Sequence, residues 1–214
     1  ATDQMIDTPT NNFATLNPLA TADYAPTYAE GNLSCIANTT DASVNQFMGY
    51  STQGFTEGKW YAEFIPVTKN SGDSGNYLIF GITDSTRDKY TYAMNGAFEW
   101  GYSSEGGYYH DGGGRTDTGF VTYTLLDIIG CAVDLDNNKI YWSKNGVWMP
   151  DPSDPSANSG GIAITSPAGG HSGEYFFEMG KTSTSRSYTS KANFGADSSF
   201  SGTKTSGSAA ASDS

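Results

Sequence analysis

The stretch DIIGCAVDLDNNKIYWSKNGVW, residues 127–148, constrains the fold more than any other part of the chain. Apolar residues alternate with polar or small ones in both of its halves, and a period of two residues is that of a half-buried β-strand. Asn145 and Gly146 supply the positive φ angles of a type I′ turn. The stretch therefore predicts antiparallel strands joined by tight turns, with one apolar face formed by Ile129, Cys131, Val133, Leu135, Ile140 and Trp142.

The same period recurs elsewhere, while apolar residues at helical spacing never extend beyond about two turns. In residues 58–67 Trp60, Ala62 and Phe64 share one face, and Pro66 lacks a backbone donor, so the strand is expected to end or to lie at an edge there. Further strands are expected in residues 76–83, 97–103, 174–180 and 191–195. Aromatic residues make up 14% of the chain and favour pleated sheet. We therefore predict an all-β chain.

Composition excludes several classes of partner. The formal net charge is −12, and the 11 Lys and Arg residues are scattered, so a polyanion such as DNA would be repelled. Neither an apolar run of 18 residues nor a basic-then-apolar N-terminus is present, so we expect no membrane insertion and no signal peptide.

Of the two cysteines, Cys35 and Cys131, the second is expected to be a small buried thiol, and the redox state of the pair stays open.

Five segments in this order resemble the SPRY, or B30.2-like, family: GKWYAEF, LIFGIT, residues 127–148, YFFEMG and ANFG. They cover roughly residues 55–196. The resemblance implies a concanavalin A-like antiparallel β-sandwich. We accordingly divide the chain into an N-terminal arm with first edge strands (1–54), the sandwich (55–200) and a flexible Gly/Ser/Ala tail (201–214). The core is expected to include Trp60, Phe64, Phe80, Ile129, Val133, Leu135, Ile140 and Phe177.

The extended N-terminal arm indicates a more specific group within this family. IDTPTNNFATLNPL, residues 6–19, followed by EGNLS, residues 30–34, is similar to the start of SPRY-containing structural proteins of tailed bacteriophages. Within this arm the isolated apolar residues Phe13, Leu16 and Leu19 are expected to anchor an otherwise polar segment. The likeness implies a virion as the location of the chain.

The sequence disfavours a metal site. Asp134, Asp136 and Asn138 occupy calcium-loop positions, but Lys139 replaces the turn glycine and Asn145 the final glutamate, so a turn is favoured over a metal site.

Catalytic groups are similarly sparse. Glu174 and Glu178 share a predicted strand face and are interpreted as surface charge, which leaves a glycan-cleaving enzyme as a minority alternative. His110 and His171 lie near no nucleophile motif. We expect that the chain is not an enzyme and that it binds no cofactor.

A binding role is favoured. The Gly-rich segment 104–119 has five glycines by Gly114 and no periodicity, and a loop this long inside a domain is often functional. Aromatic rings stack on sugars or pack on protein, while Asp and Arg orient hydrogen bonds. The alternative is that the loop tyrosines only cover the sandwich edge. The candidate ligand-binding residues are Trp100, Tyr102, Tyr108, Tyr109, His110, Asp111 and Arg115.

Two functions therefore remain open. The chain is either a non-enzymatic phage virion protein, in contact with other virion proteins, copies of itself or a host-surface glycan or protein, or a peptide- or glycan-binding recognition module that belongs to no particle.

Overall fold

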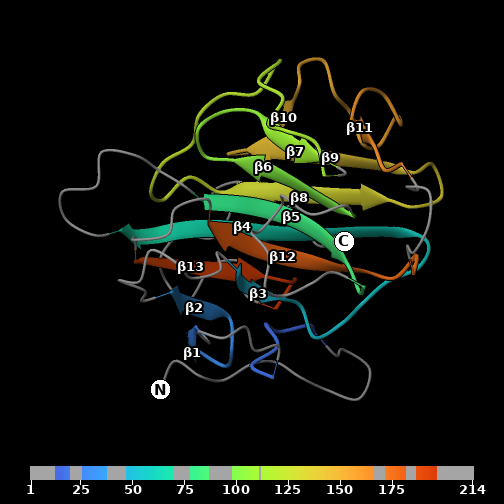
Figure 1. The fold of residues 1–214 in the computed structure, drawn as a ribbon. Coiled ribbons are helices and arrows are strands. Elements are labelled where there is room, and N and C mark those ends of the chain that lie inside the picture. The colour runs from blue at the N-terminus through green and yellow to red at the C-terminus, as the bar shows by residue number, and fades with distance from the viewer. Residues whose placement is uncertain are drawn as a thin grey trace.

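The structure is a computed structural model that describes residues 13–19, 26–37, 47–69, 78–86, 98–110, 112–165, 172–181 and 187–196. All regular secondary structure in these residues is β-strand, and the strands pair antiparallel in two sheets (Figure 1). The described part of the chain contains no helix of the length and apolarity that a bilayer crossing requires. The predicted all-β sandwich is confirmed.

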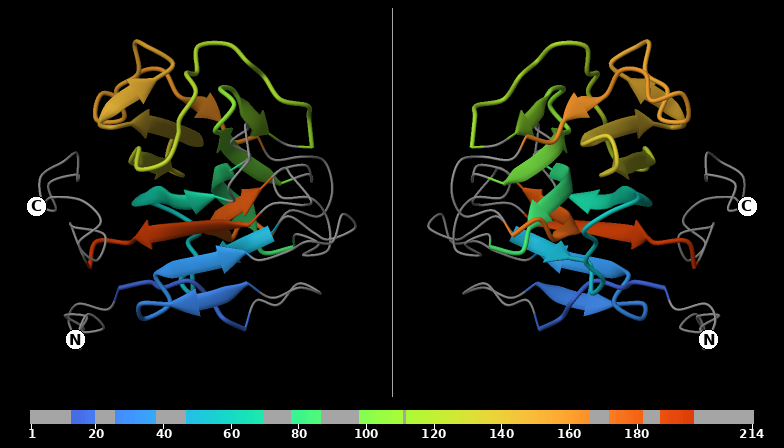
Figure 2. Two further views of the ribbon diagram at one scale, coloured as in Figure 1. Left: turned by 90° about the vertical axis from the view of Figure 1, so that its left-hand side faces the viewer. Right: turned by 90° about the vertical axis from the view of Figure 1, so that its right-hand side faces the viewer.

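The two sheets lie face to face as layers (Figure 2). The larger sheet has the order β1-β2-β13-β4-β8-β9-β10, with β11 also paired to β9. Its strands are β1 (Thr27–Ala29), β2 (Ser34–Ala37), β4 (Lys59–Lys69), β8 (Ile129–Asp134), β9 (Lys139–Lys144), β10 (Val147–Met149), β11 (Ile162–Ala163) and β13 (Tyr188–Asn193). The smaller sheet has the order β3-β12-β5-β6-β7. Its strands are β3 (Phe47–Tyr50), β5 (Leu78–Asp84), β6 (Glu99–Ser103), β7 (Tyr108–His110) and β12 (Tyr175–Lys181).

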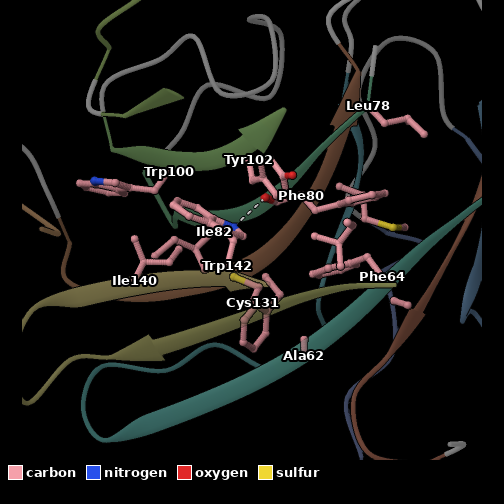
Figure 3. Packing of buried hydrophobic residues seen from close by; sticks show 14 of the residues in the cluster. Ala62, Phe64, Leu78, Phe80, Ile82, Trp100, Tyr102, Cys131, Ile140 and Trp142 are labelled. Atoms are coloured by element: carbon pink, nitrogen blue, oxygen red, sulfur yellow. Dashed lines mark hydrogen bonds between the residues drawn. The ribbon is translucent and has the colours of Figure 1, made fainter. Parts of the chain in front are cut away.

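Side chains from the two inner faces meet between the sheets (Figure 3). Phe64 of β4 stacks on Phe80 of β5, with ring centroids 5.0 Å apart. The indole N–H of Trp142 donates a hydrogen bond to the carbonyl of Phe80 across the interface, at 3.1 Å. Six of the eight predicted core residues are buried, while Trp60 and Leu135 are half-buried and pack against the cluster. Both cysteines are buried free thiols, as expected for Cys131.

The acidic turn between β8 and β9 is held by its own side chains. Asp134 accepts hydrogen bonds from the backbone N–H (3.1 Å) and the side-chain amide (2.9 Å) of Asn137, and its carboxylate lies 3.1 Å from Lys59 Nζ. Asp136 accepts a hydrogen bond from the backbone N–H of Gly58 at 3.0 Å. These contacts explain the acidic residues as framework of a turn. Among the described residues no group of three or more His, Cys, Asp and Glu is placed to hold a metal ion.

Asn145 organises the next turn, between β9 and β10. Its φ is +50° and that of Gly146 is +82°, as a type I′ turn requires. The side-chain oxygen of Asn145 accepts a hydrogen bond from the Ile128 N–H at 2.8 Å, and its amide donates to Asp127 at 2.7 Å. The residue therefore sets the turn and also ties it to the start of β8.

We expect Asn145→Ala to lower the free energy of unfolding by about 2 kcal/mol, because alanine loses both hydrogen bonds and tolerates a positive φ poorly. Urea unfolding measures the change. Asn145→Gly retains the turn conformation and should lose about half as much. A glycine variant as unstable as the alanine variant would show that the backbone conformation contributes nothing.

Of the two alternatives expected at Pro66, a strand end or an edge position, the structure has the edge position, because β4 continues to Lys69. Its partner β8 pairs only as far as Phe64, and the Pro66 carbonyl accepts a hydrogen bond from the Leu126 N–H at 2.8 Å. Pro66 therefore lies at a local edge, where a residue without an N–H is tolerated. The segment 104–119 is not one continuous loop, because it contains β7, which pairs with β6.

Among the described residues 13–19 of the arm, Leu16 is the one whose side chain enters the core. Leu16 is fully buried in the core, donates its N–H to the Asn32 carbonyl at 2.9 Å and bridges to Ser51. Phe13 is half-buried, whereas Leu19 is 84% exposed, so the expectation that Leu19 anchors the arm is wrong. Residues 1–12 and the tail 201–214 lie outside the described residues.

Asp84, at the end of β5, clamps two chain segments together. Its carboxylate accepts hydrogen bonds from the backbone N–H (2.8 Å) and hydroxyl (2.6 Å) of Thr86. It also accepts from the N–H (3.1 Å) and hydroxyl (2.9 Å) of Ser172 and from the N–H of Gly173 (3.1 Å). Burial alone would raise the pKa of Asp84, but the hydrogen bonds from Thr86 and Ser172 together hold it below its usual range.

Acid should destabilise the protein through three such carboxylates. Hydrogen bonds and lysine contacts outweigh burial and lower the pKa values of Asp127 and Asp134, as hydrogen bonds do for Asp84. A carboxyl whose folded pKa is depressed stabilises the fold above the unfolded pKa, about 3.9, and loses this contribution as the pH falls through the folded pKa. We expect the urea midpoint to stay level from pH 7 to pH 5 and to fall below about pH 4. A midpoint unchanged down to pH 2 would contradict this.

Candidate functional site

The structure divides the predicted Gly-rich cluster between the core and the surface. Trp100 and Tyr102 point inward from β6 and are fully buried, so they have no free ring face for a ligand (Figure 3). The hydroxyl of Tyr102 donates to the carbonyl of Val121, and the indole of Trp100 donates to the carbonyl of Ala163 at 3.2 Å. Trp100 and Tyr102 are therefore core residues of the sandwich, which corrects their prediction as ligand-binding residues.

Tyr108 and His110 lie on the same side of β7. They pair with Tyr102 and Trp100 in the ladder, so their side chains are directed toward the core side of the sheet. The ring of Tyr108 packs on Phe120, with centroids 5.1 Å apart. Tyr108 therefore covers the edge of the sandwich, which is the alternative that the sequence left open.

Tyr109 and Arg115 lie outward, but Arg115 is already engaged. Its guanidinium lies 2.9 Å from Glu105 and 2.6 Å from Asp117, within the same segment. Tyr109 is half-buried against Ile79, and its pKa is raised by burial, with Arg115 opposing the rise. The charged side chains of Glu105, Arg115 and Asp117 therefore pair with one another beside β7. The remaining candidate, Asp111, lies outside the described residues.

A second aromatic cluster surrounds a pocket at the start of β4, which sequence reasoning missed. Phe55 stacks on Trp60 at 5.2 Å and contacts Phe177 at 5.1 Å between ring centroids. The pocket has a volume of about 220 Å³. Its lining, hereafter the aromatic pocket, consists of Phe13, Ala14, Gln53, Phe55, Trp60, Tyr61, Phe177 and Phe194. Gln53 is the one polar amide side chain among them, and Tyr61 carries a hydroxyl.

A neighbouring pocket of about 200 Å³ lies on the outer face of the larger sheet. Ala132 of β8 pairs with Tyr61 of β4 on one side and Tyr141 of β9 on the other, so a small residue separates two aromatic ones. The Lys59–Asp134 ion pair also lines this pocket. Because Trp60 and Tyr61 line both hollows, the first residues of β4 form the ridge between them.

The carboxylates considered for catalysis do not share an open surface. Glu178 is fully buried within β12, which corrects its interpretation as surface charge, and Glu174 precedes that strand and is half-buried. His171 lies outside the described residues.

Comparison with known proteins agrees with the architecture. The crystal structure of the SPRY domain of human HERC1 matches with a TM-score of 0.59 and 16% identity, over 84% of this chain and 98% of that domain. The dual specificity protein kinase splA of Dictyostelium discoideum is 30% identical over 102 residues, which are 46% of this chain and only 4% of the kinase. No family model matches the chain. The likeness shows the SPRY fold, a concanavalin A-like sandwich.

Proposed function

We propose that this SPRY-like sandwich is a non-catalytic module that binds a segment of polypeptide. The aromatic pocket is the observation that carries the proposal. Its lining carries one side-chain amide, one hydroxyl and one indole N–H, and the last two already donate to Glu63 and to the Glu57 carbonyl, whereas a sugar needs several oriented polar groups for its own hydroxyls. Its volume of about 220 Å³ is below that of pockets for drug-sized ligands, roughly 300 Å³ and more, and suits one large apolar side chain.

The arrangement of carboxylates supports a role without catalysis. Hydrolysis of a glycosidic bond needs an acid and a second carboxylate on opposite sides of that bond. Glu178 is fully buried, so its carboxylate cannot reach a substrate that contacts the half-buried Glu174 at the surface. The two carboxylates therefore do not flank a common cleft. We therefore propose that the chain requires neither a cofactor nor a metal for its role.

The test is a parallel screen of the full chain against a displayed random nonapeptide library and a glycan array. We expect enrichment of peptides that share a large apolar residue, and no selective glycan. Binding to glycans alone would refute polypeptide recognition. Cleavage of a polysaccharide that is lost in Glu174→Gln would refute the non-catalytic role.

As the setting we propose the particle of a tailed bacteriophage, where the module contacts other virion proteins, copies of itself or the host surface. Support comes from residues 6–19, which are similar to the opening of phage structural proteins, and from Leu16 of this segment, which is buried against the sandwich. Mass spectrometry and antibody labelling of purified particles should detect the chain.

The alternative setting is a recognition module that belongs to no particle. Its support is the likeness to a domain of human HERC1 and to a segment of a Dictyostelium kinase. Purified particles that lack the chain would favour this alternative.

A further inference from the structure

β4 is longer than the strand beside it. β13 pairs with β4 from Lys69 to Glu63, where Asn193 is its last partner. On the other side β8 accompanies β4 from Lys59 to Phe64. Among the described residues no strand takes the place of β13 along residues 59–62 of β4. Within the described part of the chain, one side of this stretch, at the start of β4, is therefore an unpaired sheet edge.

The backbone groups at this edge point outward. The Gly58 carbonyl accepts a hydrogen bond from the Leu135 N–H, which places Gly58 on the β8 side. Because successive residues of a strand direct their N–H and C=O groups to opposite sides, Lys59 and Tyr61 direct theirs to the side that β13 has left. The pairing of β4 with β13 supports the same assignment of directions. The Ala192 N–H points away from β4 and donates to the Leu33 carbonyl, so the backbone groups of the next residue, Asn193, face Glu63 of β4.

The aromatic pocket lies beside this edge. Trp60 and Tyr61 belong to the free stretch, and Phe194 follows the last residue of β13. Phe13, from the arm, closes the pocket on a further side. An extended chain at the edge would therefore have a hollow for one of its side chains within reach, which is the combination that β-strand addition uses.

We propose that a basic, extended segment of a partner protein adds as a short strand to residues 59–62 of β4 and inserts one large apolar side chain into the aromatic pocket. The chain carries a net charge of −12. Glu57 lies two residues after Phe55 of the pocket lining, and Glu174 precedes Tyr175, which bridges to Phe55. Basic residues at the positions that face away from the pocket complement this charge. The proposal rests on the polypeptide-binding function above and specifies its site and mode.

The first test isolates the backbone donor of Lys59, with a nonapeptide selected on the full chain as the probe. Lys59→Pro removes an N–H that points away from β8, at the first residue of a strand, where proline is tolerated. Lys59→Ala removes the same side chain but keeps the N–H. We expect Lys59→Ala to bind within about 2-fold of the parent, and Lys59→Pro to bind roughly 3- to 10-fold more weakly, the effect of one hydrogen bond.

The second test leaves the protein unchanged, so it does not depend on the folding of a variant. Each peptide N–H is replaced in turn by N-methyl. Strand addition predicts a period of two, in which residues facing β4 lose roughly 10-fold in affinity and their neighbours change little. Equal binding of the two Lys59 variants together with a flat N-methyl scan would overturn strand addition while leaving polypeptide binding intact.

Three other outcomes also count against the proposal. If no peptide is selected, the polypeptide-binding function fails and this inference fails with it. If deletion of residues 1–12 or 197–214 tightens peptide binding about 10-fold or more, a terminal segment of this chain occupies the edge instead. If the full chain is a dimer that Lys59→Pro but not Lys59→Ala dissociates, the occupant is a second copy.

Discussion

Leu16→Ala is expected to lower the free energy of unfolding by about 3 kcal/mol, within the range for truncation of a buried leucine. Leu16 is fully buried and belongs to the central core cluster, although it lies in the polar arm that precedes the sandwich. Its N–H donates to Asn32 at 2.9 Å, so the backbone around it is held and the cavity can relax only partly. Urea unfolding followed by tryptophan fluorescence measures the loss.

Leu19→Ala is the matched control. The same change, three residues away in the same arm, removes a side chain that is 84% exposed, so the expected loss is within about 0.5 kcal/mol. Equal effects of the two substitutions would show that Leu16 is not packed in the core. The pair therefore separates burial of one side chain from any general effect of altering the arm.

The consequence for function is that the arm is part of the domain. Leu16 fixes the segment that carries Phe13, and Phe13 lines the aromatic pocket beside β4. Leu16→Ala should therefore weaken binding of a selected peptide even at temperatures where the sandwich stays folded. Such a loss links the stability of the arm to the proposed site.

The fold could be predicted from local patterns because each strand carries its own signal. The alternation in residues 127–148 predicts β8, β9 and the turns after them, and Asn145 and Gly146 adopt the positive φ angles that asparagine and glycine tolerate. The prediction was weakest where a neighbouring strand decides the outcome. The sequence left open whether β4 ends at Pro66 or lies at an edge there, because the pairing with β8 stops at Phe64 and no local pattern contains the limits of another strand.

The division of the candidate site between core and surface has the same physical reason. Tyr108 and Tyr109 are adjacent in sequence, but the pleat of β7 directs the first to Phe120 and the second outward to Ile79. The aromatic pocket was missed because it combines the arm, the start of β4 and the end of β13, which lie far apart in the sequence, between Phe13 and Phe194. Trp60 was correctly placed on the inner face, but its partial exposure follows from the early end of β13.

Asp84→Ala is expected to lower the free energy of unfolding by about 3 kcal/mol, because the backbone N–H groups of Thr86, Ser172 and Gly173 lose their shared acceptor in a partly buried turn. A charged acceptor contributes more than a neutral one, so Asp84→Asn should recover only part of the loss. The variants should also show a shallower fall in stability below pH 4, since one of the depressed carboxyl pKa values is gone.

Asp154 provides the control that decides whether burial or hydrogen-bond number matters. It accepts hydrogen bonds from the N–H and hydroxyl of Ser156 and from the Ala157 N–H, at 2.9, 2.6 and 3.2 Å, but it is exposed in a surface turn. Water replaces the lost acceptor there, so Asp154→Ala should cost far less than Asp84→Ala. Similar losses would mean that the Asp84 donors also reach water, and that the two segments it joins are held together by other contacts.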